Sequence, residues 1–287
     1  MEVFLAVVEE GSLTAGARRA GISQSAVSQL IGNLEDQVGE NLLIRKARGV
    51  EATEAGRLFA EFSRKVVSEG RALRAAFEQR QGLQAGEVRF GMIPTLAPYL
   101  LPRVLCPFRE KYPAVEISVV EGKTARLLEM VAGGEIEFAI VAEVPPADRK
   151  RWGVSLSELF QEELKLAVPD GHELATSSKL PQPKAMRGEQ MIILSGGHCL
   201  AAKSMKICGL RDGEGMVSCD QLETALAMVA AGLGVTVVPD LATRKSMPQG
   251  VTLRSFDGEG AYRAVNFARK KSHRLSRAAE ALLAEMG

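Results

Sequence analysis

The fold of the N-terminal part is decided by the stretch LTAGARRAGISQSAVSQLIGNLE, residues 13–35. Residues 13–20 favour a short helix because they are rich in alanine, and Gly21 then provides a turn. Ser23 is placed to cap a second helix by accepting a hydrogen bond from its first turn. The apolar residues of that helix recur at helical spacing: Ala26, Val27, Leu30 and Leu34. Two helices joined by a short turn containing glycine form the helix-turn-helix pattern.

Short segments on both sides complete this pattern. The apolar face of an upstream helix consists of Val3, Phe4, Val7 and Val8. Ser12, after Gly11, can cap the helix that follows. Downstream, LLIRKARGV (residues 42–50) predicts a small β-hairpin with a basic tip, a wing that would touch phosphates. Each piece alone is common in proteins that never bind DNA, but in this order and at these intervals they predict a winged helix-turn-helix.

The side chains that would touch DNA follow from this placement. The net charge of the whole chain is only +1, so any attraction to phosphates must come from local clusters of basic residues. Short hydrogen-bonding side chains early in the second helix suit base edges in the major groove, and the basic side chains of the wing suit phosphates. The predicted DNA-binding residues are Ser23, Gln24, Ser25, Ser28, Gln29, Arg45, Lys46 and Arg48.

A long helix is predicted next, opened by Thr53 and Glu54 and reaching residue 81. Its apolar positions include Leu58, Phe62, Val66 and Leu73. A helix of this length spans ~40 Å, and its apolar stripe needs a partner. Pairing with a second copy of the chain would set two reading units on successive major grooves. The alternative is that this helix packs on its own C-terminal domain.

From residue 87 the pattern becomes an alternation of strands and helices. Strands are predicted at 87–93, 115–120, 137–141, 164–168, 191–194, 216–219, 235–238, 251–256 and 265–268. Helices are predicted at 99–111, 124–132 and 222–231, with a last one ending at 286. Such alternation favours parallel sheets covered by helices, and two sets imply two lobes with a ligand-binding cleft between them.

The predicted fold class is therefore α/β, with an N-terminal winged helix-turn-helix, a linker helix and a two-lobed regulatory domain. The predicted boundaries are 1–52 for the DNA-binding domain, 53–82 for the linker helix and 86–287 for the regulatory domain. Within the last, one lobe takes 86–160 and 260–287, and the other takes 161–259.

Several classes of protein are disfavoured by composition. No apolar run approaches the ~20 residues that span a bilayer, and residues 1–11 are acidic where a secretory signal is basic, so a cytoplasmic location is expected. The four cysteines of a cytosolic chain do not suggest a disulfide scaffold, although a redox pair is compatible with them. The three histidines are scattered, so neither a metal site nor a cofactor is expected.

The chain resembles the LysR-type transcriptional regulators over nearly its whole length. The N-terminal motif is ISQSAVS (22–28), followed by Leu34-Glu35, Gly39, LLIR (42–45) and TEAG (53–56). In the C-terminal part, MVAAGLGVTVVP (228–239) is similar to the helix-to-strand segment of that family. The resemblance implies a homo-oligomer, often a tetramer with two DNA-binding dimers, and a regulatory domain like the periplasmic binding proteins. It also implies double-stranded DNA and RNA polymerase as partners.

Within this family the chain resembles the members that sense hydrogen peroxide. The matching stretches are GMIPTLAPYLLP (91–102), TARLL (124–128) and GHCL (197–200), with Cys208 following. The resemblance implies that Cys199 is the peroxidatic thiolate and Cys208 the resolving thiol, with a thiol reductant as partner. It also implies that Thr95, Thr124 and His198 bind peroxide and its ordered water, and that Arg263 helps to stabilise the thiolate. The chain departs from the pattern at Ala201-Ala202, where these relatives have Arg-Asp.

The chemistry of such a pair follows from the residues themselves. A free cysteine has a pKa of ~8.5 and is mostly a thiol at neutral pH, whereas only the thiolate attacks peroxide. Cys199 follows a glycine-rich turn and begins a helix, where the positive end of the helix dipole favours the thiolate. The sulfenic acid formed by the attack condenses with a nearby thiol to give a disulfide.

The spacing between the two cysteines suggests a switch. Cys208 lies nine positions after Cys199, which on a continuous helix is ~13 Å between Cα atoms, with the side chains on opposite faces. A disulfide needs Cα atoms within ~7 Å. If the segment is helical when reduced, oxidation must unwind it. Cys106 and Cys219 lack such a setting and are expected to be packing residues.

Two alternatives remain open at this point. One is a LysR-type regulator that binds a small carboxylate-like effector in the cleft, with Thr95 and Ser195 near helix N-termini as anion ligands and incidental cysteines. The other is a thiol peroxidase, whose chemistry overlaps with that of a sensor. The DNA-binding pattern argues against an enzyme. Taken alone, Thr95 could simply cap a helix, and His198 could be a structural histidine.

Overall fold

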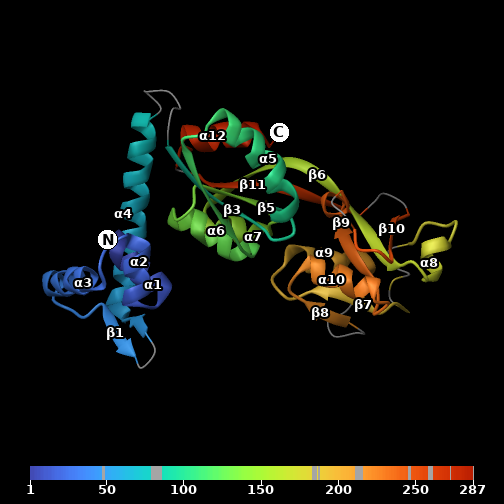
Figure 1. The fold of residues 1–287 in the computed structure, drawn as a ribbon, viewed down its shortest axis with the longest axis horizontal. Helices are drawn as coiled ribbons and strands as arrows, with labels where there is room; N and C mark the ends of the chain where they lie inside the picture. The colour runs from blue at the N-terminus through green and yellow to red at the C-terminus, as the bar shows by residue number, and fades with distance from the viewer. Residues whose placement is uncertain are drawn as a thin grey trace. The chain divides into compact units, whose positions relative to one another are not determined.

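The computed structural model describes residues 1–46, 49–78, 86–182, 186, 188–210, 216–244, 247–257, 261–271 and 273–286. The chain forms two compact units, one built from the elements α1 to α4 and the other from β3 to α12 (Figure 1). Arg48, which was predicted to contact DNA, lies outside the described residues. Within the described residues, no helix combines the length and the apolar character needed to cross a membrane.

The N-terminal unit has the predicted winged helix-turn-helix order. Its elements are α1 (Glu2–Glu10), α2 (Leu13–Ala20), α3 (Gln24–Val38), β1 (Leu43–Lys46), β2 (Gly49–Ala52) and α4 (Glu54–Glu78). Both predicted helix caps are confirmed: the Ser12 hydroxyl accepts a hydrogen bond from the Ala15 N–H, and Ser23 accepts one from Ala26. Strands β1 and β2 form the antiparallel hairpin of the wing.

A small apolar core holds the three short helices together. It is formed mainly by Phe4, Leu5, Val7, Ala17, Val27, Ile31, Leu42, Val50 and Ala60. Gly16 is required where α2 crosses α1, because a Cβ atom there would lie 2.7 Å from the Val7 side chain. The predicted apolar face of α1 matches this core, but that of α3 was partly wrong: Val27 and Ile31 are buried, whereas the predicted Leu30 is 47% exposed.

Helix α4 carries an exposed apolar stripe. Leu58, Phe62, Val66 and Leu73 expose between 46% and 66% of their surface. Their spacing places them within one narrow face of a helix with 3.6 residues per turn. A face of this kind costs free energy in water, roughly in proportion to its apolar area.

The second unit is organised around one long mixed sheet (Figure 1). In its first lobe, β3 (Gly86–Met92) pairs in parallel with β4 (Val115–Glu121) and β5 (Phe138–Ala142). Helices α5 (Ala97–Lys111) and α6 (Thr124–Gly133) connect these strands. Phe90 and Phe138 are partners in the β3–β5 register, and their rings stack with centroids 5.0 Å apart.

The strand β6 (Val154–Pro169) belongs to both lobes. Its residues 154–163 pair antiparallel with β11 (Tyr262–Lys270), which continues the sheet from β5. From Leu164 onward, β6 pairs with β9 (Thr236–Pro239) and β10 (Val251–Ser255) of the second lobe. The lobes therefore share an unbroken strand, and they meet at the peptide bond between Glu163 and Leu164.

The prediction of parallel sheets was wrong for this part of the molecule. Strand β6 is much longer than the predicted 164–168, β11 is longer than 265–268, and both run antiparallel to their neighbours. The reason is local: the first half of β6 reads VSLSELFQEE and is only partly buried. This half of β6 contains no continuous apolar run from which a strand could be predicted.

The second lobe contains the two cysteines of interest. Strands β7 (Met191–Leu194) and β8 (Met216–Cys219) form a parallel pair, and a bridge from Met191 to Val235 joins β7 to the chain just before β9. Helices α9 (Cys199–Cys208) and α10 (Leu222–Ala230) pack on β7. The remaining helices are α7 (Pro146–Trp152), α8 (Glu173–Thr176), α11 (Asp240–Thr243) and α12 (Arg277–Ala284).

Candidate functional site

The site is built on α9, which begins at Cys199 and ends at Cys208. His198 is the N-cap residue, and Gly209 closes the C-terminus with a left-handed φ of 63°. The segment between the cysteines is thus one continuous helix, and both thiols are free. At ~1.5 Å per residue, the two Cα atoms are ~13 Å apart, which is about twice the distance that a disulfide tolerates.

The two faces of α9 contact different parts of the unit. One face is buried in the second lobe and consists of Leu200, Ala201, Ser204 and Cys208. On another face, Cys199 and Lys203 lie one turn apart and reach the end of β5. Cys199 interacts there with the backbone of Ala142, and the Lys203 ammonium pairs with the Glu143 carboxylate. The helix therefore bridges the lobes through the face that carries Cys199.

The surroundings of the Cys199 sulfur combine burial with groups that favour the thiolate. Burial has the largest effect and raises the pKa of the thiol above its ordinary value. The Arg263 charge, the Thr124 hydroxyl and the backbone at Leu200 and Ala142 act in the opposite direction and lower that pKa. The predicted position at a helix N-terminus is confirmed, but burial outweighs the groups that stabilise the thiolate.

Thr124 lies beside this sulfur, and His198 directly precedes Cys199 in the chain. The Thr124 hydroxyl is buried and makes no hydrogen bond of normal geometry to any residue that the structure describes. His198 is 9% exposed, and its pKa is lowered, first by burial and then by the Lys123 charge, against the opposing effect of Asp220. His198 is therefore neutral at neutral pH, with one ring nitrogen able to donate and the other able to accept a hydrogen bond.

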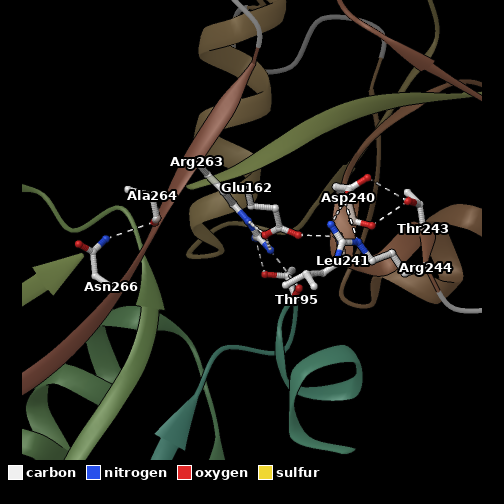
Figure 2. Close-up of polar contacts among 9 residues, drawn as sticks. All are labelled: Thr95, Glu162, Asp240, Leu241, Thr243, Arg244, Arg263, Ala264 and Asn266. Carbon is white, nitrogen blue, oxygen red and sulfur yellow. Dashed lines mark hydrogen bonds and ion pairs between the residues drawn. The ribbon is translucent and has the colours of Figure 1, made fainter. Parts of the chain in front are cut away.

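Arg263 and Thr95 form a buried polar network with Glu162 (Figure 2). Arg263 is 1% exposed; its Nη1 donates to Thr95 Oγ1 at 2.9 Å and its Nη2 to the Thr95 carbonyl at 3.2 Å. Its Nε donates to Glu162 Oε2 at 2.8 Å. Thr95 is thus a hydrogen-bond partner of Arg263. It does not cap α5, because the N-cap residue of that helix is Leu96.

The residues considered for a carboxylate effector are already bonded within the chain. The Ser195 hydroxyl donates to the Asp220 carboxylate, and Thr95 accepts from Arg263. Lys123 donates to the Gly196 carbonyl at 2.7 Å and lies over Gly197, just before α9. No group of three His, Cys, Asp or Glu side chains in the described part of the chain is arranged to hold a metal ion.

The other cysteines differ from one another. Cys208 is fully buried, and burial raises the pKa of its thiol to about 12. Cys219 is half-buried at the end of β8 and donates weakly to the Gln221 carbonyl. Cys106 is exposed on α5, so the prediction that it is a packing residue was wrong: it lies on the outer face of a helix whose inner face holds Val104 and Phe108.

Most of the side chains predicted to read DNA are accessible. Gln24, Ser25 and Gln29 are exposed on α3, as are Arg45 and Lys46 on the wing. Ser28 is half-buried, and its hydroxyl oxygen accepts a long hydrogen bond from Arg45 Nη2 at 3.5 Å, which links the wing to α3. Ser23 serves as the helix cap, with its hydroxyl also 3.0 Å from that of Ser25.

Three groups near the site were missed by sequence reasoning. They are Glu162, the Lys203–Glu143 pair and Lys123. Only Lys203 carried a signal, because it lies four residues after Cys199 and so on the same helical face. Ala201 is buried and Ala202 is exposed, and as alanines neither brings a charge to Cys199. The cations near the site are Arg263, Lys123 and Lys203.

Comparisons with known proteins agree with this organisation. The profile of the lysR family of bacterial regulatory helix-turn-helix proteins matches residues 1–57, and that of the LysR substrate binding domain matches residues 81–287. The chain is 33% identical over 245 residues to a hydrogen peroxide-inducible genes activator of Haemophilus influenzae, covering 84% of this chain and 79% of the relative.

Solved structures are similar over almost the whole chain. A full-length OxyR variant from Pseudomonas aeruginosa matches with a TM-score of 0.78 at 24% identity, covering 99% of this chain and 92% of that one. A hydrogen peroxide-bound mutant of OxyR from Corynebacterium glutamicum matches with a TM-score of 0.64 at 26% identity, covering 99% and 91%. The chain belongs to the LysR family of bacterial helix-turn-helix proteins, which are transcriptional regulators.

Proposed function

We propose that this chain is a DNA-binding transcriptional regulator that responds to hydrogen peroxide by forming a Cys199–Cys208 disulfide. Residues 1–52 bind double-stranded DNA, the helix from residue 53 pairs two copies, and residues 86–287 sense peroxide. The observation that carries the proposal is the placement of both cysteines at opposite ends of one continuous helix. A disulfide is incompatible with that helix, so oxidation changes the fold of the second lobe.

The first chemical step takes place at Cys199. Its thiolate attacks one oxygen of hydrogen peroxide, the O–O bond breaks, and the other oxygen leaves as water after accepting a proton. Cys199 becomes a sulfenic acid. Arg263 and the Thr124 hydroxyl favour the thiolate, the Thr124 hydroxyl lies beside the sulfur where it can bond a peroxide oxygen, and His198, whose pKa is lowered, can relay a proton.

The second step requires Cys208 to leave the core of its lobe. Its sulfur attacks the sulfenic sulfur, the S–O bond breaks, and a second water is released. Two thiols and one peroxide thus yield one disulfide and two waters. Each chain consumes one peroxide per cycle and then needs a thiol reductant, as a thiol peroxidase would; the DNA-binding unit of the same chain favours a switch over an enzyme. Its DNA target places this cycle in the cytoplasm.

The exposed stripe of α4 supports a homo-oligomer as the form that binds DNA. Leu58, Phe62 and Val66 form a continuous apolar surface that a second copy of the same helix would cover. Two copies would place two α3 helices with their exposed Gln24, Ser25 and Gln29 side chains on one duplex, with Arg45 and Lys46 on the phosphates. Two such dimers would make the tetramer that is common in this family.

The proposal is tested by mass spectrometry of the full chain after a brief pulse of one equivalent of peroxide. We expect a loss of two hydrogens and a peptide pair linked through Cys199 and Cys208. Cys199→Ser and Cys208→Ser should each abolish that pair, and Cys106→Ser should retain it. The same oxidised and reduced samples then select fragments of genomic DNA, and the footprints on the selected fragments should differ.

Two results would contradict the proposal. One is a linked pair that involves Cys106 or Cys219 in place of Cys208. The other is a footprint that changes equally with peroxide in the Cys199→Ser variant, which would place peroxide sensing elsewhere in the chain.

A further inference from the structure

Glu162 is a buried carboxylate with no role in the chemistry described above. It is 4% exposed and lies on β6, one residue before the pairing of that strand passes from β11 to β9. A buried charge is expensive unless it is paired. Glu162 is paired to Arg263, and this pair therefore lies where the two lobes join.

Both carboxylate oxygens are occupied by groups from different elements (Figure 2). Oε2 accepts from Arg263 Nε and lies 2.8 Å from Arg263 Nη2. Oε1 accepts from the backbone N–H of Leu241 at 2.7 Å, in the first turn of α11. The carboxylate cannot rotate away from the guanidinium without losing the Leu241 hydrogen bond, so its position is fixed from two sides.

We propose that Glu162 is a positioning residue that sets the charge which Arg263 presents to Cys199. Glu162 neutralises the guanidinium on its Nε–Nη2 edge, while Thr95 holds the adjacent Nη1–Nη2 edge through two hydrogen bonds. This inference rests on the proposed function, because it concerns the thiol that reacts with peroxide. In this role Glu162 limits the fraction of Cys199 that is present as the thiolate.

The direction of the effect follows from charge. Arg263 lowers the pKa of Cys199, and a neutral residue in place of Glu162 would leave that guanidinium uncompensated in a buried site. Thr95 would still hold Arg263 in place. The other charged or titratable groups around this region are Asp240 with Lys165 and Arg244, Tyr99 with Glu223, Lys203 with Glu143, and His198 with Lys123 and Asp220. None of them hydrogen-bonds to Glu162 in the described chain.

The test is the pH dependence of Cys199 alkylation in the full reduced chain, followed by peptide mass spectrometry with iodoacetamide as the probe. We expect Glu162→Gln to move the midpoint of the Cys199 profile down by about one pH unit, the low end for removal of an opposing charge. Glu162→Asp keeps the charge on a shorter side chain, so it should move the midpoint in the same direction by less. Circular dichroism monitors the fold of each variant.

Two controls separate this role from a merely structural one. Glu163→Gln removes the same charge from the neighbouring residue, which points to the other face of β6, and should leave the midpoint unchanged. In an Arg263→Gln background, Glu162→Gln should have no further effect, because Glu162 acts through Arg263.

An unchanged midpoint in a folded Glu162→Gln chain would overturn the inference, as would an equal shift in the Arg263→Gln background. If neither Glu162 variant folds, the claim that Thr95 suffices to hold Arg263 is wrong and the inference falls with it. The profile needs neither peroxide nor DNA. A chain that shows the shift but forms no Cys199–Cys208 disulfide would therefore refute the proposed function and leave the electrostatic role intact.

Discussion

The two ends of α9 differ in what surrounds their sulfur atoms. Near Cys199 lie a hydroxyl, backbone groups and a guanidinium, all of which oppose the effect of burial on its pKa. Near Cys208 burial acts alone and raises the pKa to about 12. One helix thus holds one thiol among polar groups and the other in an apolar core. The comparison teaches that a reaction at Cys208 reports on the opening of the helix, whereas a reaction at Cys199 reports on local electrostatics.

The largest expected effect is the contrast in alkylation rate. At about pH 7.5, iodoacetamide should modify Cys199 faster than Cys208, because only the thiolate reacts and Cys208 is fully buried and almost entirely a thiol. The rate at Cys199 should rise about tenfold per pH unit up to its pKa. Peptide mass spectrometry over time measures both rates. In the urea-unfolded chain the two cysteines should react at the same rate. Equal rates of Cys199 and Cys208 in the native chain would contradict the prediction.

A second prediction concerns stability. Cys208→Ser should lower the free energy of unfolding by about 1–3 kcal/mol, because a hydroxyl would be buried without a ready partner. Cys199→Ser should cost less, since the Thr124 hydroxyl lies beside it. Urea unfolding measures both. Because the pKa of Cys208 is raised on folding, its contribution to stability is full below about pH 8.5 and is lost as the pH rises toward 12. In Cys208→Ala, this decrease in the free energy of unfolding between about pH 8.5 and pH 12 should be absent.

The third prediction tests whether unwinding limits the switch. Ala202 is exposed in the middle of α9, and Ala202→Gly should destabilise the helix by about 1 kcal/mol. Disulfide closure after peroxide should become about fivefold faster, since the opened helix is more populated. Quenched mass spectrometry follows the closure. The matched control is Ala227→Gly at an exposed position of α10, which should not change the rate of disulfide closure. If Ala202→Gly also leaves this rate unchanged, unwinding of α9 does not limit closure.

The smallest expected effect concerns the contact between α9 and β5. The Lys203–Glu143 pair can form only while α9 is helical, so it stabilises the reduced form. Its side chains are 20% and 43% exposed, which limits the contribution to about 0.5 kcal/mol. Glu143→Gln should therefore favour the disulfide about twofold in a glutathione redox buffer. Glu116→Gln on β4 is the control, and an effect of equal size there would mean that the pair has no specific role.

The elements that sequence predicted well are those whose signal is local. The caps at Ser12 and Ser23, the apolar runs of β7 and β8, and the start of a helix at Cys199 all depend on residues a few positions apart. The first half of β6 was missed because its residues are mostly polar, and its place in the sheet is set by pairing with β11, about one hundred residues away.

The same limit applies to the site. Cys199, Thr124 and Arg263 were named through resemblance, and their positions come together only because three distant segments meet. Glu162 contacts a residue 101 positions away, and nothing in its neighbours distinguishes it from Glu163. Periodicity can place a side chain on a face of a strand, but it cannot identify the partner that the fold brings opposite.

The continuity of β6 sets how this regulatory region can be dissected. Residues 154–163 are hydrogen-bonded in one lobe and residues 164–169 in the other, so the boundary at 160/161 suggested by sequence falls inside a strand. A fragment cut there would expose two broken ladders of unpaired amide groups, each a template for aggregation. The smallest fragment of the sensing part that can be expressed intact should therefore contain both lobes.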